Sequence, residues 1–419
     1  MNPMAAVAEH RSRSGAASAT TTGRPIRLLT FTTLFPSAAR PRHGIFVETR
    51  LRQLLATSAA SATVVAPVPW FPSGARMFGG YGALARTPRA ERRHGVDIRH
   101  PRYLMIPRLG VRIQPWTLAH AAEREIRRLV RDGAEFDLID AHYFYPDGVA
   151  AAMLARRLGK PFVVTARGSD INRIAEFEAP RRLILDAARS ASRIVAVSDA
   201  LKRAIVKLGV QPDRIAVLRN GVDLDLFRPM DRHEARRALG IDEGKVVVSV
   251  GNLAPEKGHD LFVDAVAALP GLEALIVGAG PERKRLLERI AQGSAAGRLR
   301  ILDEMPQDRL RLVYNAADAL LLPSMREGWP NVLLEALACG TPVIAADVGG
   351  VGEIVADPIV GRVVGTRDAG AFAGALSDLL ASPPERAAVR RYAESFGWDE
   401  VARAQLALFR TVLAEASPC

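Results

Sequence analysis

The stretch PSMREGWPNVLLEALACGTPVIAADVGGVGE, residues 323–353, decides the fold of this chain. The apolar run 319–322 before it ends in Pro-Ser, as a strand ends in a polar loop. Pro330 suits a first helical turn, where its fixed φ and missing N–H are tolerated. We expect a helix over 331–338, ended by a glycine, and a strand over 343–346. This order of strand, loop, helix and strand predicts a parallel α/β sheet.

The predicted helix begins at the carboxyl end of a parallel strand, which is where open α/β sheets bind ligands. Its free N–H groups and the positive end of its dipole suit a phosphate. Glu335 lies about one turn inside the helix, where a carboxylate accepts hydrogen bonds from two hydroxyls at once. Glu327 projects from the preceding loop. The alternative interpretation is a helix-terminal charge plus a solvated glutamate.

This pattern closely resembles the donor-site signature of retaining nucleotide-sugar glycosyltransferases of family 4 (glycosyl transferases group 1), which have the GT-B fold. The signature consists of Pro-Ser, Glu-Gly, a second Glu eight positions after the first, Ala-x-Gly-x-Pro-Val and Gly-Gly-x-x-Glu, found here at 323–324, 327–328, 335, 338–343 and 349–353. The resemblance implies that Glu335 holds the donor ribose and that Glu327 touches the transferred sugar. It also implies that the amides near Val332 and Leu333 face the diphosphate.

The composition fits a globular protein with two domains. The chain has 419 residues, of which 48% are hydrophobic, and this is enough to fill two cores. No apolar stretch is long enough to cross a bilayer, and residues 1–23 lack the apolar segment of a secretory signal, so we expect a disordered tail. The two cysteines, Cys339 and Cys419, argue against a disulfide framework and favour a reducing cytoplasm. We expect Cys339 to be a buried packing residue.

Short strands alternate with helices in two sets that separate near residue 228, which predicts two doubly wound α/β domains. The family resemblance implies that these are Rossmann-like domains of a GT-B fold facing a central cleft. We predict a tail at 1–23, an N-terminal acceptor-binding domain at 24–228, a nucleotide-sugar-binding domain at 229–397, and a C-terminal helix at 398–419 that crosses back to the first domain.

Two histidines of the first domain are candidate acceptor-binding residues. His43 and Gly44 end a loop after the first strand, and a glycine at a helix start lets an anionic ligand approach the backbone. In the family this loop borders the acceptor, often with two glycines. His142 follows an apolar strand, and we expect it to face the cleft in a binding or proton-handling role. The alternatives are an ordinary surface loop and a structural histidine.

Arg167 occupies a position where family members usually carry a histidine near the transferred sugar and phosphate. A guanidinium stabilises phosphate charge but stays protonated, so it cannot act as a base near neutral pH. We therefore interpret Arg167 as an electrostatic residue. The alternative is a salt bridge between Arg167 and Asp170.

A second loop with candidate donor contacts follows the predicted strand 245–250. The family usually has an arginine directly after the first glycine of this loop and a lysine before the next glycine, both binding the diphosphate. Here Gly251 and Lys257 match, whereas Asn252 stands where the arginine is usual. We expect Arg167, across the cleft, to supply the missing positive charge. The alternative for Lys257 is a solvated side chain.

The resemblance implies a retaining hexosyltransferase that moves a sugar from a nucleotide diphosphate sugar to a glycan or lipid-linked acceptor, in cell-surface polysaccharide or glycolipid biosynthesis. The implied mechanism is dissociative and needs charge stabilisation more than a protein base, so we assign catalytic roles to Arg167, Lys257 and Glu327. No carboxylate cluster or Cys/His set has the spacing of metal ligands. We expect no metal, and no cofactor other than the nucleotide-sugar co-substrate.

Two other classes of function remain open. A sugar-nucleotide epimerase of the same fold would release free nucleotide and a changed monosaccharide without an acceptor. A non-enzymatic protein that binds anionic polymers would explain the net charge of +12. No RNA-binding or DNA-binding signature is found, so we expect no nucleic-acid partner.

The charge is unevenly distributed and suggests an anionic membrane surface as a further partner. Residues 1–228 contain 36 Lys and Arg against 19 Asp and Glu, a net charge of +17, whereas residues 229–419 have a net charge of −5. Eight arginines lie among aromatic residues of the first half: Arg86, Arg89, Arg92, Arg93, Arg99, Arg102, Arg108 and Arg112. We predict peripheral attachment to the inner face of the cell membrane. The alternative is a solvated arginine-rich surface.

Overall fold

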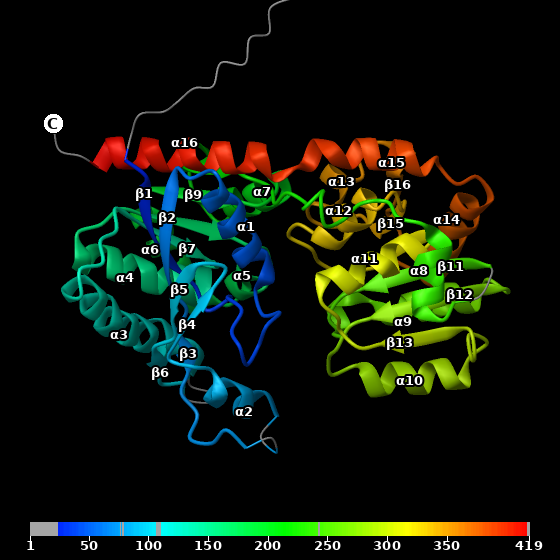
Figure 1. Ribbon diagram of the computed structural model, residues 1–419, viewed down its shortest axis with the longest axis horizontal. Helices are drawn as coiled ribbons and strands as arrows, with labels where there is room; N and C mark the ends of the chain where they lie inside the picture. The colour runs from blue at the N-terminus through cyan, green and yellow to red at the C-terminus, as the bar shows by residue number, and fades with distance from the viewer. Residues whose placement is uncertain (1–23, 76, 78, 106–109, 242–243, 417–419) are drawn as a thin grey trace, which may run out of the picture.

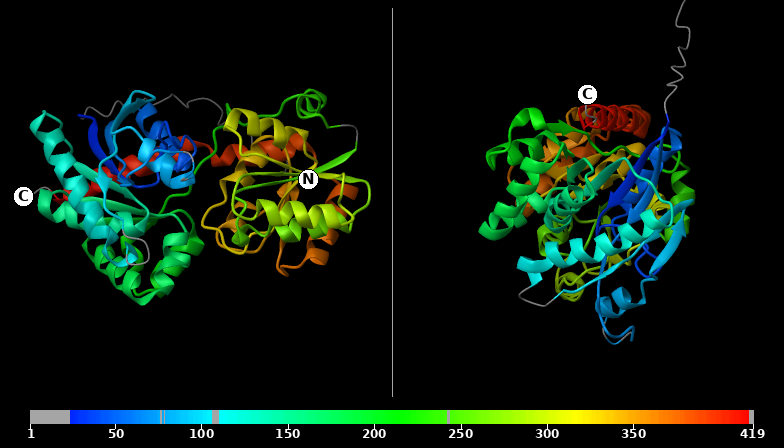
Figure 2. Two further views of the ribbon diagram at one scale, coloured as in Figure 1. Left: turned by 90° about the horizontal axis from the view of Figure 1, so that it is seen from below. Right: turned by 90° about the vertical axis from the view of Figure 1, so that its left-hand side faces the viewer.

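The computed structural model describes residues 24–75, 77, 79–105, 110–241 and 244–416, and the side chains of residues 110–112 are left out of the description. The predicted disordered tail at 1–23 lies outside these residues. Two α/β domains lie side by side, and helix α16 (Trp398–Ala416) runs along the top of the first one (Figure 1). Seen from below, the domains form two separate lobes (Figure 2).

The first domain is built on an eight-stranded sheet in the order β10-β9-β8-β7-β1-β2-β5-β4. Every neighbouring pair is parallel except β4 and β5. The strands are β1 (Ile26–Phe31), β2 (Ala60–Val65), β4 (Ala90–Arg93), β5 (Val96–Arg99), β7 (Leu138–His142), β8 (Phe162–Ala166), β9 (Arg193–Ala196) and β10 (Ile215–Val217). A separate parallel pair is formed by β3 (Val68–Pro69) and β6 (Arg102–Tyr103).

The helices of the first domain are α1 (Ile45–Ala56), α2 (Gly79–Arg86), α3 (Gly110–Arg131), α4 (Val149–Leu158), α5 (Ser169–Asn172), α6 (Glu178–Ser190) and α7 (Asp199–Lys207). All residues of β7 and β8 are buried, as expected of central parallel strands covered by helices on both faces. The segment 70–116 contains α2, the short strands β4, β5 and β6, and the first residues of α3.

The second domain has a parallel six-stranded sheet in the order β13-β12-β11-β14-β15-β16. Its strands are β11 (Lys245–Val250), β12 (Leu272–Val277), β13 (Leu299–Leu302), β14 (Ala319–Leu322), β15 (Val343–Ala346) and β16 (Gly361–Val364). Its helices are α8 (Arg232–Leu239), α9 (His259–Ala267), α10 (Arg283–Gln292), α11 (Gln307–Ala316), α12 (Asn331–Ala338), α13 (Val351–Ile354), α14 (Ala369–Ala381) and α15 (Arg386–Ala393). Two doubly wound α/β domains are thus present, which confirms the predicted fold class.

The stretch that decides the fold adopts the predicted elements, with α12, β14 and β15 at the expected bounds. One detail differs. Pro330 precedes α12 as its N-cap, with ψ of 92°, and does not form the first helical turn. The ring still fits because a proline supplies no N–H that the helix start would leave unpaired. Cys339 is buried behind the end of the helix, as predicted.

Helix α16 returns to the first domain, as predicted. Leu406, Phe409 and Val412 of this helix are buried in one apolar cluster with Ile26 and Leu28 of β1. Burial of a large apolar side chain stabilises the folded protein by about 1.5–3 kcal/mol. The C-terminal segment of the chain thereby completes the core of the N-terminal domain.

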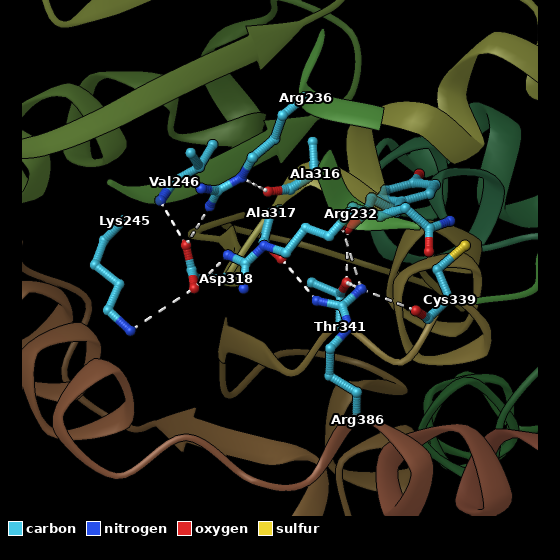
Figure 3. A network of polar contacts seen from close by, with 12 residues as sticks. Arg232, Arg236, Lys245, Val246, Ala316, Ala317, Asp318, Cys339, Thr341 and Arg386 are labelled. Carbon is cyan, nitrogen blue, oxygen red and sulfur yellow. Dashed lines mark hydrogen bonds and ion pairs between the residues drawn. The ribbon is translucent and has the colours of Figure 1, made fainter. Parts of the chain in front are cut away.

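A network of polar contacts ties together the second domain at the base of its sheet (Figure 3). The Asp318 carboxylate, at the start of β14, accepts a hydrogen bond from the Val246 amide at 2.7 Å and one from Arg236 at 3.1 Å, and it forms an ion pair with Arg232. Arg386 of α15 donates to the carbonyl oxygen of Cys339 at 3.0 Å. The network joins α8, α15 and two central strands to the turn that ends α12.

The two domains are also joined by Glu353 of α13. Its carboxylate accepts hydrogen bonds from the backbone N–H groups of Asp199 and Ala200, at 3.1 and 2.9 Å, which begin α7 in the first domain. It forms an ion pair of 2.7 Å with Arg219, in the linker between the domains. A carboxylate at a helix N-terminus is favoured by the free N–H groups and the dipole there. Glu353 therefore holds the facing surfaces of the domains in register.

Candidate functional site

A cavity of about 930 Å³ lies between the two domains. Nine of the candidate site residues predicted from the sequence line this cavity: His43, Gly44, Arg167, Gly251, Asn252, Lys257, Glu327, Val332 and Glu335. They come from loops at the carboxyl ends of β1, β8, β11 and β14, and from the first turns of α12. Two nominated residues, His142 and Leu333, do not line the cavity.

Lys257 and Glu327 form an ion pair in the cavity wall. The Lys257 ammonium lies 2.6 Å from a carboxylate oxygen of Glu327, although 70 residues separate the two in the chain. The Glu327 side chain is only 9% exposed, so neither residue is the solvated side chain of the alternative interpretation. The pair places one fixed positive and one fixed negative charge beside the N-terminus of α12. Such an arrangement suits a ligand with a diphosphate next to hydroxyl groups.

The N-terminus of helix α12 borders the same cavity as this pair. Asn331 and Val332 line the cavity, where the free N–H groups of the first turn favour an anion. Leu333 differs from our expectation, because its side chain is fully buried and its amide donates to the carbonyl oxygen of Pro330 at 3.1 Å. Of the two predicted amide contacts, only the one near Val332 borders the cavity.

Glu335 lies one turn further along α12 and is nearly buried. Its Oε2 accepts a hydrogen bond of 2.7 Å from the Tyr314 hydroxyl, and its Oε1 lies 3.4 Å from the amide nitrogen of Gln307. Burial raises the pKa of Glu335, and the hydrogen bonds from Tyr314 and Gln307 oppose this shift. The carboxylate is thus held in one orientation with acceptor capacity left for ligand hydroxyls. Sequence reasoning missed Tyr314, because a tyrosine on the buried face of an amphipathic helix resembles an ordinary core residue.

Gly44 precedes α1 with φ of 72°, a left-handed conformation that favours glycine. A Cβ at this position would lie 2.8 Å from the backbone nitrogen of Phe35, so the close passage of two backbone segments also requires glycine. His43 beside it accepts a hydrogen bond at Nδ1 from Arg40, at 2.6 Å. Burial and the Arg40 charge lower the pKa of His43 to about 4. The ring is therefore neutral near pH 7.

Arg167 extends from the end of β8 into the cavity wall. Its guanidinium donates to the side-chain oxygen of Asn220 at 3.1 Å and to Nδ1 of His142 at 2.8 Å, and it lies 5.2 Å from the centre of the Phe46 ring. Burial lowers the pKa of Arg167 to about 9, so it remains charged at pH 7. The alternative salt bridge is not formed, because Asp170 accepts hydrogen bonds from the backbone N–H of Arg167. Arg167 therefore lines the cavity as a charged residue held by Asn220 and His142.

His142 does not face the cleft, contrary to the sequence-based expectation. The residue is 1% exposed and lies behind Arg167. Its Nε2 is 3.2 Å from the Asp140 carboxylate, which fixes the tautomer that accepts from Arg167 at Nδ1. Burial lowers the pKa of His142. The imidazole therefore orients the arginine and does not contact the cavity.

Asn220 lies in the segment between β10 and α8 that joins the domains, and it connects residues that line the cavity without lining it itself. Its side-chain oxygen accepts hydrogen bonds from Arg50 at 3.2 Å and Arg167 at 3.1 Å, and its amide nitrogen donates to Asn331 at 3.2 Å. The side chain thus connects the arginine of one domain to the first residue of α12 in the other.

The predicted basic surface of the first domain is less uniform than its arginine content suggests. Arg93 pairs with Glu48 at 2.8 Å, and Arg102 donates to backbone carbonyl groups. Arg108 lies outside the described residues, and the Arg112 side chain is not described. The same segment exposes large apolar side chains: Trp70, Met77, Tyr81, Leu104, Ile113 and Trp116.

No cluster of three or more His, Cys, Asp or Glu side chains suited to a metal ion occurs in the described parts of the chain. Within the same ranges, no helix is both long and apolar enough to cross a membrane.

Comparison with known proteins identifies two family models. Residues 78–226 match "Glycosyltransferase Family 4" and residues 231–396 match "Glycosyl transferases group 1". D-inositol 3-phosphate glycosyltransferase of Mycobacterium tuberculosis is 35% identical over 316 residues, which cover 68% of this chain. The match spans 64% of the length of that relative.

Solved structures share the fold over nearly the whole chain. Sucrose-phosphate synthase from Thermosynechococcus elongatus superimposes with a TM-score of 0.77 at 21% identity, covering 94% of this chain and 100% of the other. Anabaena HepE in complex with UDP-glucose superimposes with a TM-score of 0.70 at 22% identity, covering 92% and 99%. These similarities support the GT-B architecture.

Proposed function

The chain belongs to the glycosyltransferases whose domains match the family 4 and group 1 models, and we propose that it transfers a sugar from a nucleotide diphosphate sugar to an acceptor bound against the first domain. The observation that carries this proposal is the shared cavity of Lys257, Glu327, Glu335 and the N-terminus of α12. Its fixed charges suit a diphosphate, and its buried carboxylate suits a ribose.

We propose that the transfer proceeds with retention of configuration, which the resemblance to the family implies. The bond between the anomeric carbon and the diphosphate oxygen breaks, and the electron pair leaves with the diphosphate. Lys257, Arg167 and the N–H groups of α12 stabilise the negative charge that develops on the leaving group, and Glu327 faces the sugar. The acceptor hydroxyl forms the new bond on the same face of the sugar, and its proton passes to the leaving phosphate oxygen. This scheme requires neither a protein base nor a metal.

A UDP-sugar is the first donor to test. The titles of the HepE structures name UDP and UDP-glucose as ligands of that protein, which supports a donor of this class here. We propose a glycan or lipid-linked acceptor in cell-surface polysaccharide or glycolipid synthesis on the cytoplasmic side of the membrane. The name of the mycobacterial relative supports including D-inositol 3-phosphate in the acceptor panel.

The test is a thermal-shift screen of the purified protein with UDP-, GDP- and ADP-sugars, because a ligand that binds only the folded state raises the Tm. Release of nucleotide diphosphate is then followed with and without acceptors. A transferase requires an acceptor for rapid release. An epimerase produces free nucleotide and a changed monosaccharide at the same rate without one, and that result would reject the proposal.

Attachment to an anionic membrane surface is a second part of the proposal. The first half of the chain has a net charge of +17, and the segment 70–116 exposes apolar side chains such as Trp70 and Met77. Each basic side chain near an anionic bilayer contributes about 1 kcal/mol, so several suffice for reversible binding. Sedimentation should require anionic lipid and should decline as salt rises. Equal sedimentation with neutral and anionic vesicles would favour a soluble acceptor.

A further inference from the structure

A second, smaller cavity of about 170 Å³ lies in the first domain. It shares Leu34, Arg40 and His43 with the cavity between the domains, so the two spaces adjoin at the loop after β1. The rest of the lining combines apolar residues (Phe35, 66–69 and Leu84) with the polar residues Thr33, Ser37, Thr87, His100 and Tyr103. The cavity therefore has room for one small chemical group beside a single guanidinium.

Arg40 differs from the neighbouring arginines in its lack of an anionic partner. Arg42 pairs with Glu304 at 2.8 Å and Arg93 pairs with Glu48 at 2.8 Å. No acidic side chain among the described residues lies within ion-pair distance of Arg40, which donates to the His43 ring. Burial lowers the pKa of Arg40, yet a guanidinium keeps its charge near neutral pH. A half-buried positive charge without a counter-charge is costly, and a bound anion would relieve it.

His43 sets the direction of the Arg40 guanidinium. Its Nδ1 accepts from Arg40, and its Nε2 lies 3.0 Å from the carbonyl oxygen of Thr33, to which it donates. Only the neutral ring with its proton on Nε2 makes both hydrogen bonds. In this arrangement the remaining N–H groups of Arg40 are left for other acceptors. His43 is therefore a positioning residue for Arg40.

The loop that carries Arg40 is held in place at several points. Ser37 and Arg40 exchange backbone hydrogen bonds of 3.2 and 2.9 Å. The Ala38 amide donates to Glu91 of β4 at 3.0 Å, and the other oxygen of Glu91 lies 2.7 Å from Nε2 of His100. Because these contacts fix the backbone, the guanidinium is preorganised and loses little freedom when it binds a ligand.

Tyr103 adds a polar group to the same small cavity. Its hydroxyl oxygen accepts a hydrogen bond from the side-chain amide of Gln114 at 3.0 Å. Burial raises the pKa of Tyr103 to about 12, so the hydroxyl keeps its proton near pH 7 and can donate it. A ligand that accepts several hydrogen bonds would therefore meet donors on more than one side.

We propose that Arg40 and the adjoining small cavity bind an anionic group of the acceptor, a phosphate monoester or a carboxylate, and so hold the acceptor for attack in the larger cavity. This assignment rests on the proposed function for its acceptor, although the anion site itself can be tested separately. The bound group forms charge-assisted hydrogen bonds with Arg40, and the hydroxyl of Tyr103 offers a further donor. A soluble sugar phosphate and a lipid headgroup would both supply such an anion.

The experiment measures binding of inorganic phosphate and glucose 6-phosphate by calorimetry, in the presence and absence of saturating UDP, which occupies the predicted diphosphate site. The parent is compared with Arg40→Gln, Arg40→Lys and the matched control Arg92→Gln, since the Arg92 side chain is 71% exposed and lies outside both cavities. A parallel arm measures vesicles with and without phosphatidylinositol, which separates a lipid source from a soluble one.

We expect the parent and Arg92→Gln to bind both phosphate probes equally well in UDP. Arg40→Gln should weaken binding roughly tenfold or more, as expected for a lost charged hydrogen bond, while Arg40→Lys retains part of it. Unchanged binding by Arg40→Gln, or no phosphate binding by the parent, would overturn the assignment. If the protein binds phosphate but no nucleotide sugar, the anion site is supported and the proposed function is rejected.

Discussion

Gly168 and Gly328 bring the two domains into backbone contact across the cleft. A Cβ on Gly168 would lie 2.9 Å from the Cα of Gly328, and a Cβ on Gly328 would collide with the carbonyl oxygen of Arg167. Gly168 also has φ of 127°, which side chains rarely adopt. The contact places the backbone of Arg167 beside the loop that carries Glu327. The Glu-Gly part of the signature thus has a steric reason in this fold.

The first prediction is that Gly328→Ala impairs transfer without unfolding the protein. The added methyl group forces the domains apart and misplaces Arg167 relative to the donor loop. A misplacement of about 1 Å lowers the rate by about 100-fold. Nucleotide diphosphate release and Tm should be measured beside the control Gly365→Ala, where a Cβ meets no atom within 4 Å. Full activity of Gly328→Ala would show that the glycine contact is not needed.

The second prediction treats Arg167 and Asn252 as a compensating pair. Both line the cavity, and Asn252 stands where the family usually has an arginine. If Arg167 supplies the missing charge, Arg167→Ala should be severe in the parent and milder in an Asn252→Arg background. The rates of nucleotide diphosphate release by the four proteins form a double-mutant cycle. Strictly additive losses of rate would show that the two residues do not compensate for each other.

Much of the fold was predictable because it depends on short-range patterns. The apolar runs at β14 and β15 and the glycine after α12 define their elements within a few residues of sequence. Lys257 and Glu327 were each predicted as site residues, but no local sequence pattern reveals that they form an ion pair. Arg40 lies in the same loop as His43 and Gly44, but the sequence does not single it out from the other arginines. Its importance comes from the absence of a nearby carboxylate among the described residues, which is a property of the folded surface.

The third prediction concerns the protonation of His43. Burial and Arg40 lower its pKa to about 4, whereas the usual value is 6.5. Between these pH values the unfolded chain binds more protons than the folded one, so this contribution to stability is lost as the pH falls through that window. ¹⁵N NMR of histidine-labelled protein, assigned with His43→Gln, should show a neutral ring with its proton on Nε2 at pH 6. A titration midpoint near 6.5 would contradict the buried geometry.

The fourth prediction concerns the network around Asp318. Asp318→Ala leaves Arg232 and Arg236 without their counter-charge and the Val246 amide without its side-chain acceptor. Loss of one partner from a buried ion-pair network costs about 3–5 kcal/mol. Chemical denaturation should report this loss of unfolding free energy. The control Asp303→Ala removes one exposed ion pair with Arg283 and should change stability by less than about 1 kcal/mol.

The roles of the buried polar residues could not be predicted from the sequence. His142 was expected at the cleft because it follows a strand, but the arrangement of Asp140 and Arg167 around it is a long-range property. Asn220 and Tyr314 likewise act through partners on distant elements. Motifs identify residues that meet a ligand more readily than residues that orient them, because orientation depends on tertiary contacts.

The central claim is that a nucleotide diphosphate sugar binds beside α12, and calorimetric titration of UDP-, GDP- and ADP-sugars tests it most directly. Glu335→Gln is the sharpest variant, because its amide oxygen still accepts from the Tyr314 hydroxyl while the carboxylate charge is lost. Lys257→Ala removes the charge assigned to the diphosphate. We predict that at least one of these donors binds the parent and that both variants weaken it at least tenfold, with Tm values near that of the parent. Equal affinity in the parent and both variants, or no binding of any donor, would contradict the account.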